Sequence, residues 1–487
     1  MKFGFSAMFS ALRSAFSNSR NTHTNPFALS LSKCLAHWRQ GFLRQAQDDR
    51  AYRLSPNGVG GAAKCATVTS SLLSGLLSSF AAHAQTPLTM WVHAGPGPEA
   101  DAYVAAVKVF SNQNPNIALR LVKLPEGSYS DQVYAAALAR KLPCVLDFDG
   151  PNLYNVAWTQ RLMPLNGFPE LMRIRADMLP SLVRQGSYNN QFFGMGQFDS
   201  GLALWGNKAL LTKAGVRIPT QVNEAWNLAE FEAALKALQA SGLKHPLDMK
   251  FNYGAGEWFS YGFSPIVQSF GGDLIDRSNF KTAQGAINGD AAVHAMTALQ
   301  SWAKAGYVNA ASKSDADFIQ GRAALSYVGH WTFKDYKKAL GDELVLIPMP
   351  KFGSAAVTGA GSWNFGISAN CKQPQAAAKL LAHLMSTTEI LRVTEANGAV
   401  PGTNAALALS KNYGPGGALR LYVDQIQQKV ARVRPETPAY PVISSAFSEA
   451  VNNIMAGASV KAELDKAAAK IDQDLADSRG YPVSAKP

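Results

Sequence analysis

The sequence predicts an α/β fold, in which strands of a mostly parallel sheet alternate with helices and ligands bind at the carboxyl ends of the strands. Two patterns support this prediction. Near residue 88, apolar residues recur with a period of two, then at helical spacing, then again with a period of two. The same alternation of strand and helix patterns continues along the chain. The composition, 47% hydrophobic and 16% charged, is that of a globular protein.

The first three elements form one unit. Residues 88–92 alternate as a strand does, a Gly/Pro loop follows, and residues 103–110 carry apolar side chains at helical spacing. Residues 117–121 alternate again. A strand, a helix and a strand in this order predict a parallel pair joined by a right-handed crossover.

Later segments extend the pattern. Gly306 is expected to end one helix, and Pro374 to open another, where its missing N–H does no harm. Helices are predicted over 131–141, 228–240, 264–270 and 291–305, from Pro374 onward, and over most of 446–475. Strands are predicted over 145–148 and 323–328, and within 343–350 and 363–368.

The net charge of +12 lies mostly in the first 84 residues. They hold nine Lys and Arg against two Asp, which leaves +5 for the rest of the 487-residue chain. No dense basic run follows residue 85, so nucleic acid is not predicted as a partner.

Residues 1–84 read as a leader. A run of small and apolar residues, 66–82, follows Lys64, and Ala82-His83-Ala84 suits a signal peptidase, which predicts export and cleavage near Ala84. An uncleaved anchor is the alternative, although the run is Ser-rich and shorter than the about 20 apolar residues of a membrane span. The first 58 residues fit nothing secretory, and a translation start near Val59 is our hypothesis.

Two cysteines remain after the leader. In an exported chain, Cys144 and Cys371 could form one disulfide or stay as two buried thiols, and their spacing does not decide between these states.

Four stretches of the chain carry a resemblance to a known family. In order they are "LTMWVHAGPGPEADAYVAAVKVFSNQNPNI", "LPCVLDFDGPNLYNVAWTQRLMPL", "GLALWGNKALLTKAGVRIPT" with "AWNLAEFEAAL", and "FIQGRAALSYVGHWTFKDY". With them, the chain from about 88 to 475 resembles the family 1 extracellular solute-binding proteins of ABC importers, a carbohydrate-binding group. It departs at Cys144, where the family commonly has an acidic residue after Leu-Pro.

The resemblance implies a two-lobed periplasmic-binding-protein fold of type II, in which a hinge closes the lobes on a ligand in the cleft between them. The first lobe would hold residues 86–198 and about 350–400, and the second 199–349 and about 401–487. "GQFDSGLAL" would be the first segment that crosses between them. The protein would be a periplasmic monomer without cofactor or metal. It would deliver a mono- or oligosaccharide to the transmembrane subunits of an ABC permease.

A sugar site needs polar partners for hydroxyls and aromatic platforms for the C–H faces. The resemblance places Trp331 and Trp258 at the ligand, with Glu257 as a weaker neighbour; a core role is the alternative for Trp331. Asp149 and Asn152 follow the strand "VLDFD" and are expected to bind sugar hydroxyls or, alternatively, to cap helices. Asp199 could contact ligand or stabilise the hinge. The further candidates are Trp363, His93, Glu99, Tyr129 and Tyr440.

Other functions were weighed against a binding protein. Asp147, Asp149 and Asp199 could supply the carboxylate pair of a glycoside hydrolase, but nothing in the sequence marks a raised-pKa acid. The sequence holds no nucleophile-elbow, zinc-protease or Walker motif, and its histidines lack metal-ligand spacing. The ligand could instead be a polyol or a glycerol-3-phosphate-like solute, and the protein could also serve a chemoreceptor.

Overall fold

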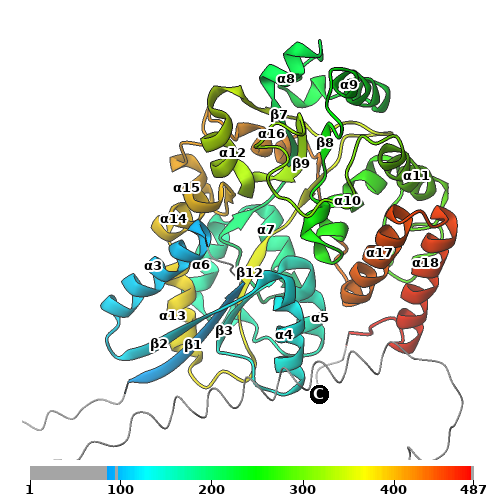
Figure 1. Ribbon diagram of the computed structural model, residues 1–487. Coiled ribbons are helices and arrows are strands. Elements are labelled where there is room, and N and C mark those ends of the chain that lie inside the picture. The colour runs from blue at the N-terminus through cyan, green and yellow to red at the C-terminus, as the bar shows by residue number, and fades with distance from the viewer. Residues whose placement is uncertain (1–84, 94–96, 484–487) are drawn as a thin grey trace, which may run out of the picture. The chain divides into compact units, whose positions relative to one another are not determined.

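A computed structural model describes residues 85–93 and 97–483 of the protein (Figure 1). The predicted leader, its cleavage site near Ala84 and the hypothetical start near Val59 lie outside these residues. The described part contains two four-stranded sheets, together with smaller two-stranded pairs. Each of the larger sheets has its own hydrophobic core.

The first sheet contains the predicted parallel pair. In spatial order its strands are β12 (Trp363–Ile367), β3 (Val145–Asp149), β1 (Thr86–His93) and β2 (Ile117–Leu124). β1 pairs in parallel with both β2 and β3, which confirms the predicted strand–helix–strand unit. β12 runs antiparallel to β3 and places Trp363 opposite Asp149. The sequence patterns did not predict this antiparallel edge.

Helices cover the first sheet on both faces, as Figure 1 shows for α3 and α13 on one face and α4 and α5 on the other. The reason lies in the alternation along β1. Leu88, Met90 and Val92 are buried against one set of helices, whereas Trp91 packs with the other. The first set comprises α3 (Pro98–Gln113), α13 (Pro374–Leu384) and α14 (Thr387–Asn397); the second comprises α4 (Glu126–Leu138) and α5 (Leu153–Trp158).

The second sheet is mixed. In spatial order its strands are β10 (Leu344–Ile347), β7 (Leu202–Asn207), β9 (Leu325–Gly329) and β8 (Leu247–Asp248). β7 runs antiparallel to both of its neighbours, and β8 is parallel to β9. Its core is shared with α9 (Leu228–Ala240), α10 (Glu257–Ser269), α11 (Asp290–Lys304), α17 (Tyr440–Met455) and α18 (Val460–Asp477).

Helix α9 shows how local sequence sets an element. The side chain of Asn227 accepts a hydrogen bond from the backbone N–H of Glu230, and Glu230 bonds back to the N–H of Asn227, so a capping box fixes the start. Phe231, Leu235 and Leu238, which share one face, are fully buried. The helix spans residues 228–240 as predicted.

The chain passes between the two sheets through short paired segments. β6 (Phe198–Asp199) pairs with β13 (Val400–Pro401), and β11 (Thr358–Ala360) pairs with β14 (Ala431–Val433). Met195 still bridges to β12 of the first sheet, whereas Leu202 already belongs to the second sheet. The predicted crossing segment "GQFDSGLAL" therefore does run from one sheet to the other.

The remaining elements are short. They are α6 (Pro169–Asp177), α7 (Pro180–Gln185), β4 (Ser187–Tyr188), β5 (Gln191–Phe192), α8 (Lys208–Lys213), α12 (Phe333–Leu340), α15 (Asn404–Leu409) and α16 (Arg420–Gln427). In the described part of the chain, no helix is both long enough and apolar enough to cross a membrane.

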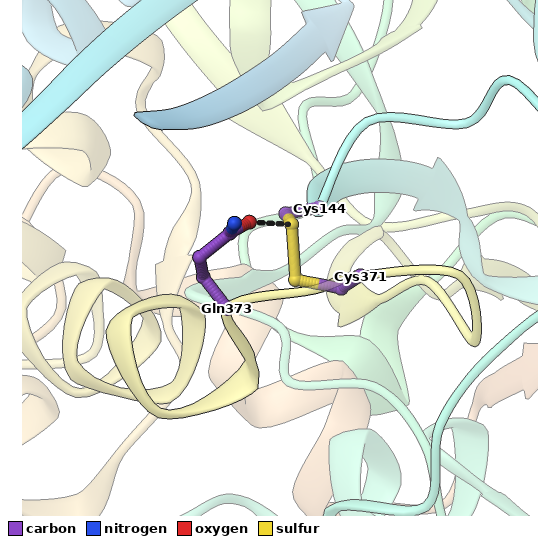
Figure 2. The surroundings of a disulfide bond; sticks show 3 residues. All are labelled: Cys144, Cys371 and Gln373. Atoms are coloured by element: carbon purple, nitrogen blue, oxygen red, sulfur yellow. Dashed lines mark hydrogen bonds between the residues drawn. A yellow bond between two sulfur atoms is a disulfide. The ribbon is translucent and has the colours of Figure 1, made fainter. Parts of the chain in front are cut away.

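A disulfide ties β3 to the segment after β12. Cys144 and Cys371 are bonded, which decides between the two states that the sequence left open. Figure 2 shows the bond beside Gln373, whose side-chain oxygen lies 3.6 Å from the sulfur of Cys144. The bond lies at the end of the β3–β12 pair opposite Asp149 and Trp363, and it therefore joins the two strands that carry these residues.

Candidate functional site

A buried guanidinium joins elements of the two sheets. Arg434, directly after β14, is 5% exposed, and its two terminal nitrogens bind the two carboxylate oxygens of Asp149 at 2.5 and 2.6 Å. One of these nitrogens also binds a carboxylate oxygen of Glu257 at 2.5 Å. Asp149 ends β3 of the first sheet, and Glu257 opens α10 on the second sheet. One cation is therefore shared by carboxylates from both halves.

The surroundings of Arg434 keep it charged. Burial alone lowers the pKa of Arg434, but Asp149, Tyr440 and Glu257 outweigh burial and raise the pKa above its usual value. The guanidinium also lies over the ring of Tyr261, with its carbon 4.8 Å from the ring centroid.

Glu257 is the accessible member of this cluster. Its side chain is 36% exposed, although it accepts hydrogen bonds from Ser444 at 2.8 Å and from the hydroxyl of Tyr440. As the first residue of α10, it also lies at the positive end of the helix dipole. Tyr440 itself is fully buried, and its hydroxyl contacts Glu257, so the predicted contact of Tyr440 with a ligand stays a prediction.

One aromatic group lies at the end of the first sheet. This first aromatic group consists of His93, Tyr129 and Trp363. The rings of His93 and Trp363 are stacked with centroids 3.4 Å apart, and Tyr129 meets Trp363 edge-on at 5.4 Å. His93 Nδ1 is 2.5 Å from a carboxylate oxygen of Asp147, and its Nε2 is 3.5 Å from Glu99. Trp363 is half-buried.

A second aromatic group belongs to the second sheet. It consists of Tyr253, Trp258, Tyr261 and Trp331. Trp258 meets Trp331 edge-on at 6.0 Å and Tyr253 at 5.3 Å, and the indole N–H of Trp331 donates to the hydroxyl of Tyr253 at 3.2 Å. A Cβ on Gly329 would lie 2.0 Å from the Trp331 ring, so only glycine lets this ring lie against the end of β9.

The second aromatic group rests on a buried lysine. Lys250 is fully buried, and its amine lies 2.8 Å from carboxylate oxygens of both Asp248 and Asp315. Its backbone is left-handed, with φ of 56°, a strained conformation that costs a lysine about 1 kcal/mol or more. The ion pairs of the amine anchor the turn that ends at Tyr253. In this turn the backbone carbonyl of Met249 accepts a hydrogen bond from the indole N–H of Trp258.

Asp199 lies where the crossing segments meet. It is fully buried and accepts hydrogen bonds from Ser181 at 2.5 Å and from the N–H groups of Ser200 and Gly361 at 2.9 Å. Burial raises the pKa of its carboxyl, and these hydrogen bonds oppose the rise. Ser200 and Gly361 belong to the segments that cross between the sheets, and both expected roles of Asp199, ligand contact and hinge stabilisation, stay predictions.

The structure brings the predicted residues into two places. His93, Glu99, Tyr129, Asp149 and Trp363 gather at the end of the first sheet. Trp258 and Trp331 share the second aromatic group, and Tyr440 lies beneath Glu257. Asn152 lies beside Asp149 in sequence, and its side-chain oxygen accepts a hydrogen bond from Tyr134 at 2.9 Å. Neither Asp149 nor Asn152 caps a helix through its side chain, which argues against the alternative considered for them.

Sequence reasoning missed part of the site. Arg434, Tyr253, Tyr261 and Lys250 are not among the residues that the sequence predicts. A charged residue between apolar Val433 and Pro435 in "ARVRPETPAY" was the available signal for Arg434. No comparable signal marks Tyr261, because its spacing is that of any residue on a buried helix.

The two cavities described next lie away from the predicted ligand residues, and the described residues contain no metal-binding group. A cavity of about 600 Å³ near Trp158 and Tyr188, and one of about 430 Å³ near Lys244 and Asp317, are lined by none of the predicted ligand residues. Among residues 85–93 and 97–483, no three His, Cys, Asp or Glu side chains are grouped to hold a metal ion.

Comparisons with known proteins agree on the fold. A family model described as bacterial extracellular solute-binding protein matches residues 105–415. The GacH receptor of Streptomyces glaucescens is 22% identical, with a TM-score of 0.68 over 82% of this chain and 98% of its own. The substrate-binding protein Lmo0181 of Listeria monocytogenes is 18% identical, with a TM-score of 0.69 over 80% and 99%.

A third solved structure, the sugar-binding protein MalE of Xanthomonas citri, is 19% identical, with a TM-score of 0.66 over 81% of this chain and 98% of its own. At these identities the likeness concerns the fold. The chain has the two-lobed α/β fold of these binding proteins, which confirms the predicted fold class.

Proposed function

Because the chain belongs to the bacterial extracellular solute-binding proteins, we propose that it captures a mono- or oligosaccharide between its two lobes and passes it on chemically unchanged. The receiver is the transmembrane part of an ABC permease. Membership in an extracellular family implies export. Cleavage near Ala84, a periplasmic location and a monomeric state are further parts of the proposal.

One observation carries this proposal. The site combines half-buried indole rings with fixed carboxylates. The rings are those of Trp363 on the first sheet and of Trp258 and Trp331 on the second. The carboxylates are those of Asp149 and Glu257, which the guanidinium of Arg434 joins across the two sheets. A sugar presents flat C–H faces and hydroxyls in alternation, so it needs this combination of stacking surfaces and fixed acceptors.

The solved relatives support a carbohydrate. The GacH receptor structures include complexes with acarbose and an acarbose homologue, and Lmo0181 was solved with cycloalternan. MalE is described as a sugar-binding protein. These ligands belong to those proteins, and they favour a carbohydrate over the polyol and glycerol-3-phosphate-like solutes considered from the sequence.

The lobes and residue roles follow from this proposal. Residues 86–198 and about 350–400 form the first lobe, and 199–349 and about 401–487 the second. The indole rings of Trp331, Trp258 and Trp363 stack on the sugar rings. Hydrogen bonds to the sugar hydroxyls come from the side chains of Asp149 and Asn152. His93, Glu99 and Tyr129 shape the first-lobe side, Tyr440 positions Glu257, and Asp199 stabilises the hinge.

The contacts of Asp149 fit binding better than hydrolysis. Both of its carboxylate oxygens accept hydrogen bonds from Arg434, which fixes the carboxylate as an acceptor. A glycosidase acid must instead carry a proton that it can release to the leaving group.

Titration with a carbohydrate panel tests the proposal. The exported protein is titrated by calorimetry and intrinsic Trp fluorescence with mono- and oligosaccharides, and each mixture is then checked for products. We expect saturable binding of one sugar class, near micromolar or about −8 kcal/mol, with no product. Trp331→Ala should weaken this binding, whereas Trp158→Ala, beside the C-terminal segment, should not. Turnover, or no binding to any sugar, would overturn the proposal.

A further inference from the structure

We propose that this site rejects anionic solutes, and that the pairing of Arg434 with Asp149 and Glu257 determines this selectivity. The inference rests on the proposed function and narrows it, because it assigns the ligand to uncharged sugars and excludes acidic sugars and sugar phosphates.

The charges around the site are the first argument. Carboxylates outnumber cations there, even if His93 is counted as protonated and if Asp199 and Glu257, whose pKa values burial raises, are both counted as neutral. The carboxylates are Glu99, Asp147, Asp149, Asp199, Glu257 and Glu436, and the cations are Arg184, Arg434 and His93. Each cation already lies within ion-pair distance of at least one carboxylate. An arriving anion would therefore meet a site that carries net negative charge.

The geometry of Arg434 is the second argument. Anions are usually recognised by the two terminal nitrogens of an arginine acting as a fork. Here that fork is closed on Asp149, and one of its nitrogens also serves Glu257. Only Nε has no hydrogen-bond partner, and it is buried. An anion could bind both terminal nitrogens of Arg434 in this paired way only by displacing Asp149, whose carboxylate would then be left unpaired in a buried place.

The start of α10 is the third argument. A helix N-terminus is the other common anion site, because its free N–H groups and dipole favour negative charge. In this protein the first residue of α10 is Glu257, which places a carboxylate in the first turn of the helix. The same residue thus pairs with Arg434 and sets a negative charge against the positive end of the helix dipole. Because its side chain is 36% exposed, its carboxylate is also partly accessible from outside the cluster.

Freeing Arg434 should therefore create an anion site. The test compares the full protein with Glu257→Gln and Asp149→Asn, using inorganic phosphate and glucuronate as probes in low-chloride buffer, by calorimetry and thermal shift. We expect no saturable binding to the wild-type protein. Either substitution should strengthen binding of these anions by roughly tenfold or more, since one neutralising charge is lost.

A matched control separates this effect from net charge. Glu436→Gln removes one carboxylate from the same region, but Glu436 pairs with Arg184 and not with Arg434. It should leave anion binding unchanged. Equal gains for Glu436→Gln and Glu257→Gln would overturn the role of the Arg434 pairing.

The outcomes distinguish this inference from the proposed function. Saturable, submillimolar binding of phosphate or glucuronate to the wild-type protein, abolished by Arg434→Met, would overturn the inference while sugar binding stood. Failure of every neutral sugar to bind would overturn the proposed function, and the anion titrations of the three variants would still decide the inference. Unfolding curves of each variant confirm that it is folded before binding is compared.

Discussion

Two buried cations, Arg434 and Lys250, are paired in the same way but do different work. Each is held by two carboxylates and each lies close to an aromatic ring. The carboxylates of Lys250, Asp248 and Asp315, both come from the region of the second sheet. Those of Arg434 come from β3 of the first sheet and α10 of the second.

The difference lies in what each ion pair joins. Lys250 anchors a turn within one half of the molecule, and we expect it to stay paired whether or not the lobes move. Arg434 joins the halves, so its contacts depend on how they are placed. We therefore interpret the ion pairs of Lys250, whose partners share one core, as structural. The ion pairs of Arg434, whose partners come from two cores, are in our interpretation also functional.

The covalent link in the first sheet sets the largest expected effect. Asp149, the main partner of Arg434, ends a strand that the Cys144–Cys371 disulfide ties to β12 across 227 residues. Closing a loop of that length restricts the unfolded chain and contributes up to about 5 kcal/mol. The Cys144→Ala/Cys371→Ala double variant should lose most of this in chemical denaturation. An unchanged midpoint would contradict the assignment of the disulfide.

Removing Lys250 tests the ion pair within one core. Lys250→Met leaves Asp248 buried without its counter-charge, which should lower the free energy of unfolding by about 3–5 kcal/mol. Asp248→Asn added to Lys250→Met should recover part of the loss. Lys236→Met, on an exposed position of α9, is the control and should change stability by less than about 0.5 kcal/mol. Equal effects at Lys236 and Lys250 would show that Lys250 is not anchored as described.

A buried base without a carboxylate partner, His330, shows by contrast what the carboxylates do for the buried Lys250. Burial lowers the pKa of Lys250, but Tyr336 and Asp248 outweigh it and raise the pKa overall. His330 has no such partner, and burial lowers its pKa to about 4. Its Nδ1 lies 2.9 Å from the carbonyl of Asn397 and its Nε2 lies 2.7 Å from the hydroxyl of Ser200, which fits the neutral tautomer.

This difference predicts a pH dependence. The unfolded chain binds the His330 proton near pH 6.5 and the folded chain only near pH 4, so stability falls as the pH drops through this window. The loss attributable to His330 is about 3 kcal/mol at its acid end. The free energy of unfolding, measured with urea at several pH values in this range, should change with pH at different slopes in the wild-type and His330→Gln proteins. The exposed His294→Gln is the control, and identical slopes for wild type and His330→Gln would rule the effect out.

Arg434→Lys tests the fork that joins the halves. Lysine keeps the charge but cannot bind both oxygens of Asp149 and Glu257 at once, so unfolding should cost about 2 kcal/mol less. Sugar affinity should fall by roughly tenfold, because Asp149 loses its fixed orientation. Arg184→Lys, at an exposed pair with Glu436, is the matched control for both measurements. If Arg434→Lys changed neither the free energy of unfolding nor the sugar affinity, Arg434 would not couple Glu257 to Asp149.

The smallest expected effect concerns the hydrogen bond between Tyr253, at the end of the turn that Lys250 anchors, and Trp331, a proposed ligand residue. Tyr253→Phe removes only the hydroxyl that accepts the indole N–H of Trp331. We expect sugar affinity to weaken by about 0.5–1 kcal/mol and stability to change by less than that. Tyr481→Phe, which loses a hydroxyl bond to Asp474 outside the site, should leave affinity unchanged. If Tyr253→Phe also left it unchanged, the orientation of Trp331 would not depend on this turn.

Most elements of the fold were predictable because their signals are local. The capping box and one-sided apolar residues of α9, the helix opening at Pro374 and the alternation in β1 and β2 all lie within a few neighbouring residues. The position of Asp149 at the end of a buried strand was visible for the same reason. Bounds that depend on neighbours in space were less well predicted, as at α10, which begins at Glu257 and not near Ser264.

The sequence by itself determined the elements, the exported character of the chain as an expectation, and the types of residue that a sugar site needs. Only the tertiary structure decided their partners. It paired Cys144 with Cys371, set Trp363 opposite Asp149 on an antiparallel edge, and brought Arg434 to Asp149. These contacts join residues more than 200 positions apart, and a local pattern holds no information about which distant side chain will neutralise a buried charge.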